Sequence, residues 1–170
     1  MANNVPQRYV FIVDDEPIQN EMLKDFLTER YLYTINVYEN GEAALKDMHL
    51  RPEIVVLDYH LSGSNRDAMD GVQVLKAIKE TNPETQVIML SGQDKIEVAI
   101  DTMKYGAFDY VVKGESAFSR VENIINNASE IHKLKVINAS QKKAITFLVA
   151  VISLIFLGSI YMFLVKPYLQ

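Results

Sequence analysis

Four places along the chain carry side chains that could act together on a metal ion and an anion. Asp14 and Asp15 follow one apolar run, Asp58 ends a second, Ser91 follows a third and Lys113 follows a fourth. Carboxylates are the ligands that hard divalent cations prefer, while a hydroxyl and an ammonium group can donate hydrogen bonds to an anion. The ends of these apolar runs are therefore the candidate site.

Asp58 is the carboxylate at the end of residues 54–57, four apolar residues of which three are β-branched. With Pro52 before it and a polar loop at 62–70 after it, this run is typical of a strand buried on both faces of a parallel sheet. Ligands of open α/β sheets bind beyond the carboxyl ends of the strands. Taken alone, Asp58 could equally cap a helix or start a turn, and the residues at the other strand ends favour the functional interpretation.

The first two thirds of the chain alternate between apolar runs and amphipathic segments. This alternation predicts an α/β fold, a five-stranded parallel, doubly wound sheet of the flavodoxin-like kind. Because the carboxyl ends of parallel strands meet at one edge of the sheet, we expect the candidate residues to share one crevice. The predicted strands are 8–13, 33–38, 53–58, 86–90 and 108–112, and the predicted helices are 17–29, 42–50, 72–80 and 95–104.

Apolar periodicity also predicts which helix faces point inward. Pro17 suits the first turn of the first helix, and Asn82-Pro83 should stop the third helix. The inward residues predicted for these two helices are Ile18, Met22, Leu23, Phe26, Leu27, Val74, Leu75 and Ile78.

The last part of the chain predicts one long helix. No Pro or Gly occurs between Ser116 and Gly158, and the 22 residues from Ala144 to Val165 carry no charge. At about 1.5 Å per residue this segment reaches roughly 33 Å, the thickness of a bilayer's hydrocarbon core. We therefore predict one domain over residues 1–130, a basic helical linker over 131–143, a transmembrane helix over 144–165 and a short external tail over 166–170.

Charge divides the chain at the same place. Residues 1–130 hold 12 basic and 22 acidic residues, a formal charge of −10, whereas residues 131–170 hold five lysines and no acid. Four of those lysines precede the apolar segment, so the positive-inside tendency predicts a single-pass protein of the cell membrane with its N-terminal domain in the cytoplasm. The acidic domain argues against nucleic-acid binding. We expect no signal peptide, and the absence of cysteine excludes disulfides and thiolate metal sites.

Three converging carboxylates are costly at neutral pH unless a cation binds or their pKa values rise. A divalent ion held by Asp14 or Asp15 would lower the charge penalty for a phosphoryl group arriving at Asp58. This chemistry alone leaves open whether Asp58 binds a phosphate or accepts one, since carboxylates are known phosphoryl acceptors.

The set closely resembles the receiver domain of bacterial two-component response regulators, over about residues 8–130. The resemblance implies that Asp58 is phosphorylated by a histidine kinase or phosphotransfer protein, and that Asp14, Asp15 and Asp58 hold Mg²⁺. It also implies that Ser91 and Lys113 contact the phosphoryl group. The matching positions are Asp14, Asp15, Asp58, Ser91, Tyr110 and Lys113.

The same resemblance implies a switch in which Ser91 and Tyr110 move together on phosphorylation, a shift between two populated states. Residues 64–68 are an insertion beside the acceptor, which could alter access or have no effect. Gly114 stands where the family commonly has a cis proline. His60, two residues past the acceptor, either tunes the lifetime of the phosphoryl group or is a plain exposed side chain.

We therefore expect a membrane-anchored phosphoacceptor that catalyses only its own phosphoryl transfer and has no output module after residue 130. Its output would be protein–protein interaction, through the face formed by the fourth helix and fifth strand or through a homodimer. Two alternatives stay open. One is a phosphate sink that drains a kinase, and the other is a membrane scaffold that ignores phosphate.

Overall fold

The structure, a computed structural model, describes residues 7–61, 68–92 and 96–165. Within this part, the side chains of 131–137, 139–140 and 161–165 are not described. The chain divides into two compact units, Met1–Ser129 and Glu130–Gln170.

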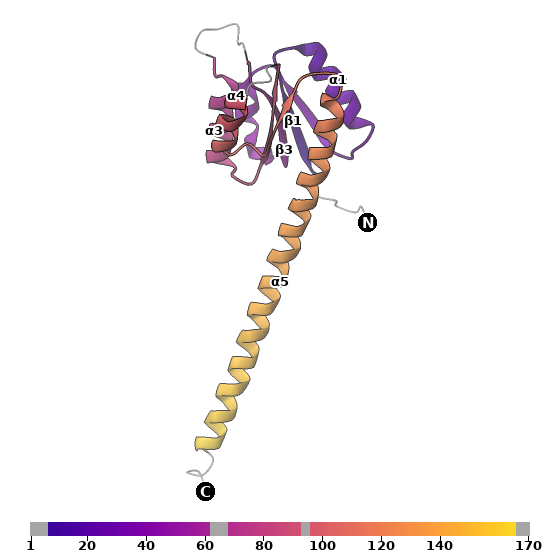
Figure 1. Ribbon diagram of the computed structural model, residues 1–170. Helices are drawn as coiled ribbons and strands as arrows, with labels where there is room; N and C mark the ends of the chain where they lie inside the picture. The colour runs from indigo at the N-terminus through magenta and orange to yellow at the C-terminus, as the bar shows by residue number, and fades with distance from the viewer. Residues whose placement is uncertain (1–6, 62–67, 93–95, 166–170) are drawn as a thin grey trace. The chain divides into compact units, whose positions relative to one another are not determined.

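The first unit contains a five-stranded, fully parallel sheet with strand order β2-β1-β3-β4-β5. This confirms the predicted parallel α/β sheet (Figure 1). The strands are β1 (Tyr9–Val13), β2 (Thr34–Tyr38), β3 (Ile54–Asp58), β4 (Gln86–Ser91) and β5 (Asp109–Val112). The helices are α1 (Pro17–Thr28), α2 (Gly41–Lys46), a 3₁₀ helix η1 (Met48–Leu50), α3 (Gly71–Thr81), α4 (Ile96–Lys104) and α5 (Ala117–Val165).

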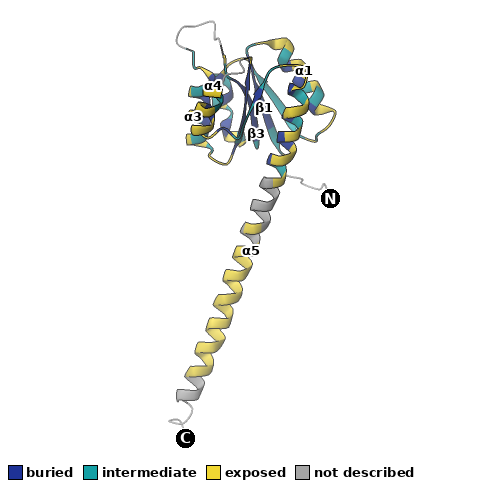
Figure 2. Cartoon of the chain, viewed as in Figure 1, coloured by how far each residue is buried: buried dark blue, intermediate teal, exposed yellow. Residues whose placement is uncertain are grey.

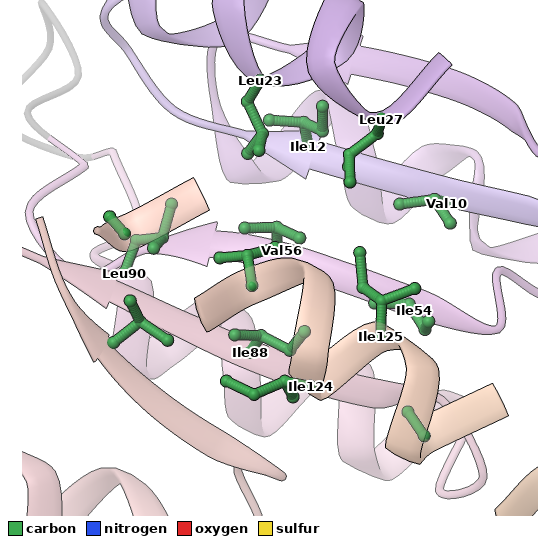
Figure 3. Packing of buried hydrophobic residues seen from close by; sticks show 14 residues of the cluster. Val10, Ile12, Leu23, Leu27, Ile54, Val56, Ile88, Leu90, Ile124 and Ile125 are labelled. Atoms are coloured by element: carbon green, nitrogen blue, oxygen red, sulfur yellow. The ribbon is translucent and has the colours of Figure 1, made fainter. Parts of the chain in front are cut away.

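Two apolar layers sandwich the sheet. On one face, Leu23 and Leu27 of α1 and Ile124 and Ile125 of α5 pack on strand residues such as Val56. Figure 3 shows these helix side chains directed at the strands. On the other face the core is formed with α2 and α3. Because β1, β3 and β4 are covered on both faces, their side chains are almost all buried, as the apolar runs predicted.

The inward face predicted for α3 is confirmed, since Val74, Leu75 and Ile78 are fully buried. The face predicted for α1 is partly wrong. Leu23 and Leu27 are buried, but Ile18 is 76% exposed and Met22 54% exposed. At 3.6 residues per turn two apolar stripes run along this helix, and the buried one contains Leu23 and Leu27, leaving Ile18 and Met22 in solvent.

The second helix is shorter than predicted. A helix over 42–50 was expected, but α2 ends at Lys46 and a separate 3₁₀ turn covers Met48–Leu50. Arg51 follows with a φ of +51°, in the left-handed region. This conformation ends helical hydrogen bonding and turns the chain into β3.

At the amino ends of the strands a polar network joins the sheet to α5. Arg8 donates to both carboxylate oxygens of Glu53, at 2.7 and 2.6 Å, and to Ser129 Oγ at 2.6 Å. Tyr33 Oη lies 2.5 Å from Ser129 Oγ, and the Arg8 guanidinium lies over the Tyr33 ring. The Glu53 side chain is only 7% exposed, so its charge depends on these donors.

Replacing Arg8 by methionine should therefore lower the free energy of unfolding by about 2–3 kcal/mol, because it leaves the buried Glu53 carboxylate without its main partner. Urea denaturation followed by tyrosine fluorescence would measure the change. Arg30→Met is the matched control, since its ion pairs with Glu29 and Glu122 lie at the surface and should be worth under about 1 kcal/mol. Equal effects of the two substitutions would contradict the role of the network.

The second unit is the distal part of α5. Every side chain that the structure describes between Gln141 and Ile160 is exposed (Figure 2). This segment has a mean hydropathy of 2.2 and is, by length and composition, able to cross a membrane. The predicted long helix is thus present as α5. The predicted tail at 166–170 lies outside the described residues.

Candidate functional site

The parallel sheet brings the predicted site residues to its carboxyl edge. Asp14 directly follows β1, Asp58 and Ser91 are the last residues of β3 and β4, and Lys113 directly follows β5. One carboxylate oxygen from each of Asp14, Asp15 and Asp58 lies within 4.8 Å of the others. The carboxylates expected to meet at this edge of the sheet therefore do so.

Lys113 connects two of the three carboxylates. Its Nζ lies 2.7 Å from Asp14 Oδ2 and 3.2 Å from Asp58 Oδ1, and 3.9 Å from a carboxylate oxygen of Glu16. The backbone N–H of Lys113 donates to the carbonyl oxygen of Ser91 at 2.7 Å, which fixes the start of this side chain against β4. Lys113 thus reaches Asp58 with Gly114 as its neighbour, the position at which the resemblance had placed a proline.

Burial and the neighbouring charges shift the pKa values of Asp58 and Lys113. Asp14 and Asp58 are each 3% exposed. Burial raises the pKa of Asp58, with Lys113 acting against this shift and the Asp14 charge adding to it. Burial lowers the pKa of Lys113, but the hydrogen bond to Asp14 and the charge of Asp58 outweigh it, so that pKa ends above its usual value.

The donor set fits a hard divalent cation. Among the described residues, Asp58 Oδ1 has no hydrogen-bond donor aligned on it, so its contact with Lys113 is an ion pair at 3.2 Å. Lys113 pairs with both Asp14 and Asp58, and one ammonium group shared by two buried carboxylates leaves negative charge in a buried place. A cation bound by oxygen ligands would neutralise that charge, and an acidic triad of this kind is typical of the Mg²⁺ site of receiver domains.

The two residues of the predicted switch lie on neighbouring strands. Ser91 is fully buried, and Tyr110 is half-buried and packs against the core on the α3 face. Tyr110 pairs with Met89 in the sheet, and Ser91 follows Met89 by two residues. Because alternate strand residues share a face, Ser91 and Tyr110 lie on the same face of the sheet.

Two residues whose roles were missed by sequence reasoning are Gly71, which lies against Asp58, and Glu42, which bonds the chain just before α3. A Cβ at Gly71 would lie 2.3 Å from the backbone oxygen of Asp58, so only glycine lets α3 start this close to Asp58. Glu42 Oε1 accepts a hydrogen bond from the N–H of Met69 at 2.7 Å. The sequence did carry one signal, because Asp70-x-x-Gln73 forms a capping box at the start of α3.

The sequence singled out two other features near Asp58, His60 and the insertion at 64–68. His60 is exposed, and its ring meets the Tyr59 ring edge-on at 4.7 Å. Residues 64–67 of the insertion lie outside the described part of the chain.

Residues 10–126 match the response regulator receiver domain family. The chain belongs to this family. A receiver domain is a signalling phosphoacceptor rather than an enzyme, and the acidic pocket of Asp14, Asp15 and Asp58 is consistent with aspartate phosphorylation.

Individual relatives agree with this receiver assignment. The chain is 32% identical over 122 residues to the chemotaxis protein CheY of Thermotoga maritima, covering 71% of this chain and 97% of that protein. It is 33% identical over 127 residues to the nitrogen assimilation regulatory protein NtrX of Azorhizobium caulinodans, covering 74% of this chain but only 27% of that longer protein. The crystal structure of the receiver domain of NtrX from Brucella abortus superposes with a TM-score of 0.64 at 30% identity, covering 71% and 98% of the two chains.

Proposed function

We propose that this chain is a phosphorylation-switched receiver of a bacterial two-component system, with Asp58 as the phosphoacceptor, and that its apolar helix anchors it to the cell membrane. The observation that carries the proposal is the ion pair of Lys113 with both Asp14 and Asp58 inside a triad of carboxylates. The phosphodonor would be a histidine kinase or a phosphotransfer protein.

The chemistry follows from the positions of these groups. A carboxylate oxygen of Asp58 forms a bond to phosphorus as the bond between phosphorus and the donor's histidine nitrogen breaks. Mg²⁺ held by Asp14, Asp15 and Asp58 would supply charge neutralisation for the transferring group. Lys113 offers its ammonium group to the phosphoryl oxygens, and the Ser91 hydroxyl donates a hydrogen bond to the product.

Phosphorylation would be read out through Ser91 and Tyr110. The phosphoryl group adds negative charge and strong hydrogen-bond acceptors at the end of β3. A new hydrogen bond from Ser91, which shares a sheet face with Tyr110, would favour one of two arrangements of the β4–β5 edge. The signal thereby reaches the neighbouring helix α4.

The surface of α4 offers a place for an output partner. Ile96 is 73% exposed, Ile100 49%, Met103 48% and Tyr105, just past the helix, 44%. Exposed apolar side chains gathered on one helix mark interaction surfaces. Either a downstream protein or a second copy of this chain could bind there.

Anchoring rests on the composition of α5. The segment Gln141–Ile160 is apolar and exposed, and Lys142 and Lys143, both exposed, stand at its amino-terminal end. Lysines on that side of a spanning helix place the receiver in the cytoplasm.

The test is labelling of the purified full chain by acetyl phosphate with and without Mg²⁺, followed by mass spectrometry. We expect one Mg²⁺-dependent phosphoryl adduct on Asp58 and none on Asp58→Asn. Asp101→Asn, which alters an exposed carboxylate that pairs with Lys104, should label like the wild type. A folded protein that forms no adduct with Mg²⁺ would refute the proposal and favour a phosphate-independent scaffold. Loss of the adduct within seconds would instead favour the phosphate sink.

A further inference from the structure

Three successive backbone N–H groups precede and begin α3, and each has its partner in a different part of the fold. The N–H of Met69 donates to Glu42 Oε1, in the first turn of α2, at 2.7 Å. The N–H of Asp70 is bonded at 2.9 Å within the capping box of α3. The N–H of Gly71 donates to the carbonyl oxygen of Tyr59, the residue after β3, at 3.3 Å. This stretch is thus tied to α2, to α3 and to the turn after β3.

The stretch lies against the residue that we propose as the phosphoacceptor. A Cβ at Gly71 would overlap the backbone oxygens of Asp58 and Tyr59, so the start of α3 and the end of β3 are in backbone contact. The insertion at 64–68 ends directly before Met69. Glu42 therefore holds the chain where the insertion rejoins the domain, two residues before the contact with Asp58.

The first turn of α2 is itself fixed in place, so it can serve as an anchor. Asn40 caps the helix by accepting a hydrogen bond from the N–H of Ala43 at 2.9 Å. A Cβ at Gly41 would overlap the side chain of Val74, which is fully buried on α3. Glu42 thus extends from a turn that is capped and packed against the helix whose start it bonds.

The hydrogen bond from Met69 lowers the pKa of the Glu42 carboxyl group. This carboxylate is therefore charged at neutral pH, and the bond is charge-assisted. We propose that Glu42 is a positioning residue for phosphoryl transfer, which fixes Met69 and, through the backbone of residues 69–71, the backbone that carries Asp58. The effect on transfer rests on the proposed function, whereas the Glu42–Met69 bond exists without it.

A local role in α2 is the alternative for Glu42. A carboxylate in the first turn of a helix is stabilised by the helix dipole, and Lys46 follows at i+4. Both local effects need the charge, whereas the bond from Met69 needs only an acceptor oxygen. Glu42→Gln keeps that oxygen and removes the charge, and Glu42→Ala removes both. Glu80→Ala, at an exposed glutamate of α3, is the matched control.

Amide hydrogen exchange, followed by NMR on the full chain in detergent micelles, reports the bond without any phosphodonor. We expect the Met69 N–H to exchange about 10-fold faster in Glu42→Ala and within about 3-fold of the wild type in Glu42→Gln. The Ala43 N–H should not change in either variant, because it donates to Asn40 and reports the capped turn. Equal acceleration at Ala43 would show fraying of α2 and would contradict the proposal.

Labelling of Asp58 by acetyl phosphate with Mg²⁺ tests the consequence for transfer. We expect about 5- to 10-fold slower labelling in Glu42→Ala, and rates within about 2-fold of the wild type in Glu42→Gln and Glu80→Ala. Equally slow labelling of Glu42→Gln would assign the effect to the charge and overturn the proposal. Wild-type labelling of Glu42→Ala would overturn the role of Glu42 alone, whereas a wild-type protein without an adduct would overturn the proposed function and this role with it.

Discussion

Replacing Lys113 by methionine is expected to slow labelling of Asp58 by about 10²- to 10³-fold, the usual cost of removing one charged group that faces a transferring oxyanion. Methionine is an unbranched side chain that ends where the lysine ammonium group begins, so the main change is loss of the charge. The initial rate of adduct formation from acetyl phosphate at saturating Mg²⁺ measures the effect. Lys104→Met is the control, because Lys104 is an exposed lysine paired with Asp101.

The same substitution should make folding depend on Mg²⁺. Without the ammonium group, Asp14 and Asp58 are buried carboxylates that have lost the cation paired with them in the described part of the chain, which should cost about 2–4 kcal/mol of unfolding free energy at pH 7 in a chelator. The pKa of Asp58, which burial raises and Lys113 holds down, then rises further in the folded state, so the deficit is largest at neutral pH and shrinks as the pH falls and this group takes up a proton. Mg²⁺ should restore much of the loss. Wild-type labelling rates, or a deficit that Mg²⁺ does not reduce, would contradict this account of Lys113.

The candidate site was predictable because it depends on topology. Once the apolar run before Asp58 is recognised as a buried parallel strand, the residues at neighbouring strand ends must meet at the same edge. Lys113 is far from Asp14 in sequence, yet β5 and β1 both end at this edge. Lys113 Nζ therefore lies 2.7 Å from Asp14 Oδ2. No detailed packing is needed for that inference.

The face of α1 was less predictable because it depends on packing. Ile18 and Met22 form an apolar stripe as convincing as that of Leu23 and Leu27, and periodicity cannot choose between them. The choice is made by Val10, Ile12 and the first turns of α5, which cover Leu23 and Leu27. The unburied stripe leaves Ile18 and Met22 exposed.

The role of Gly71 could not be predicted from the sequence for a related reason. Gly71 allows the backbone at the start of α3 to lie against the backbone at the end of β3, and these two segments meet only in the folded chain. This close approach supports the second large prediction. In Gly71→Ala the new methyl group would lie 2.3 Å from the backbone oxygen of Asp58 and 2.8 Å from that of Tyr59. Neither atom belongs to a flexible side chain, so either the start of α3 or the turn after the acceptor must move.

We expect Gly71→Ala to lower the free energy of unfolding by about 2–4 kcal/mol. Labelling of the protein that remains folded should slow by about 10- to 100-fold, because small displacements of a reacting group are costly. Gly114→Ala is the matched control, since its Cβ would meet no atom within 4 Å and it adjoins the site through Lys113. Urea midpoints and labelling rates of the two variants would decide the matter. If both alanine variants behaved alike, the close approach of α3 to the acceptor would have no part in holding Asp58 in position.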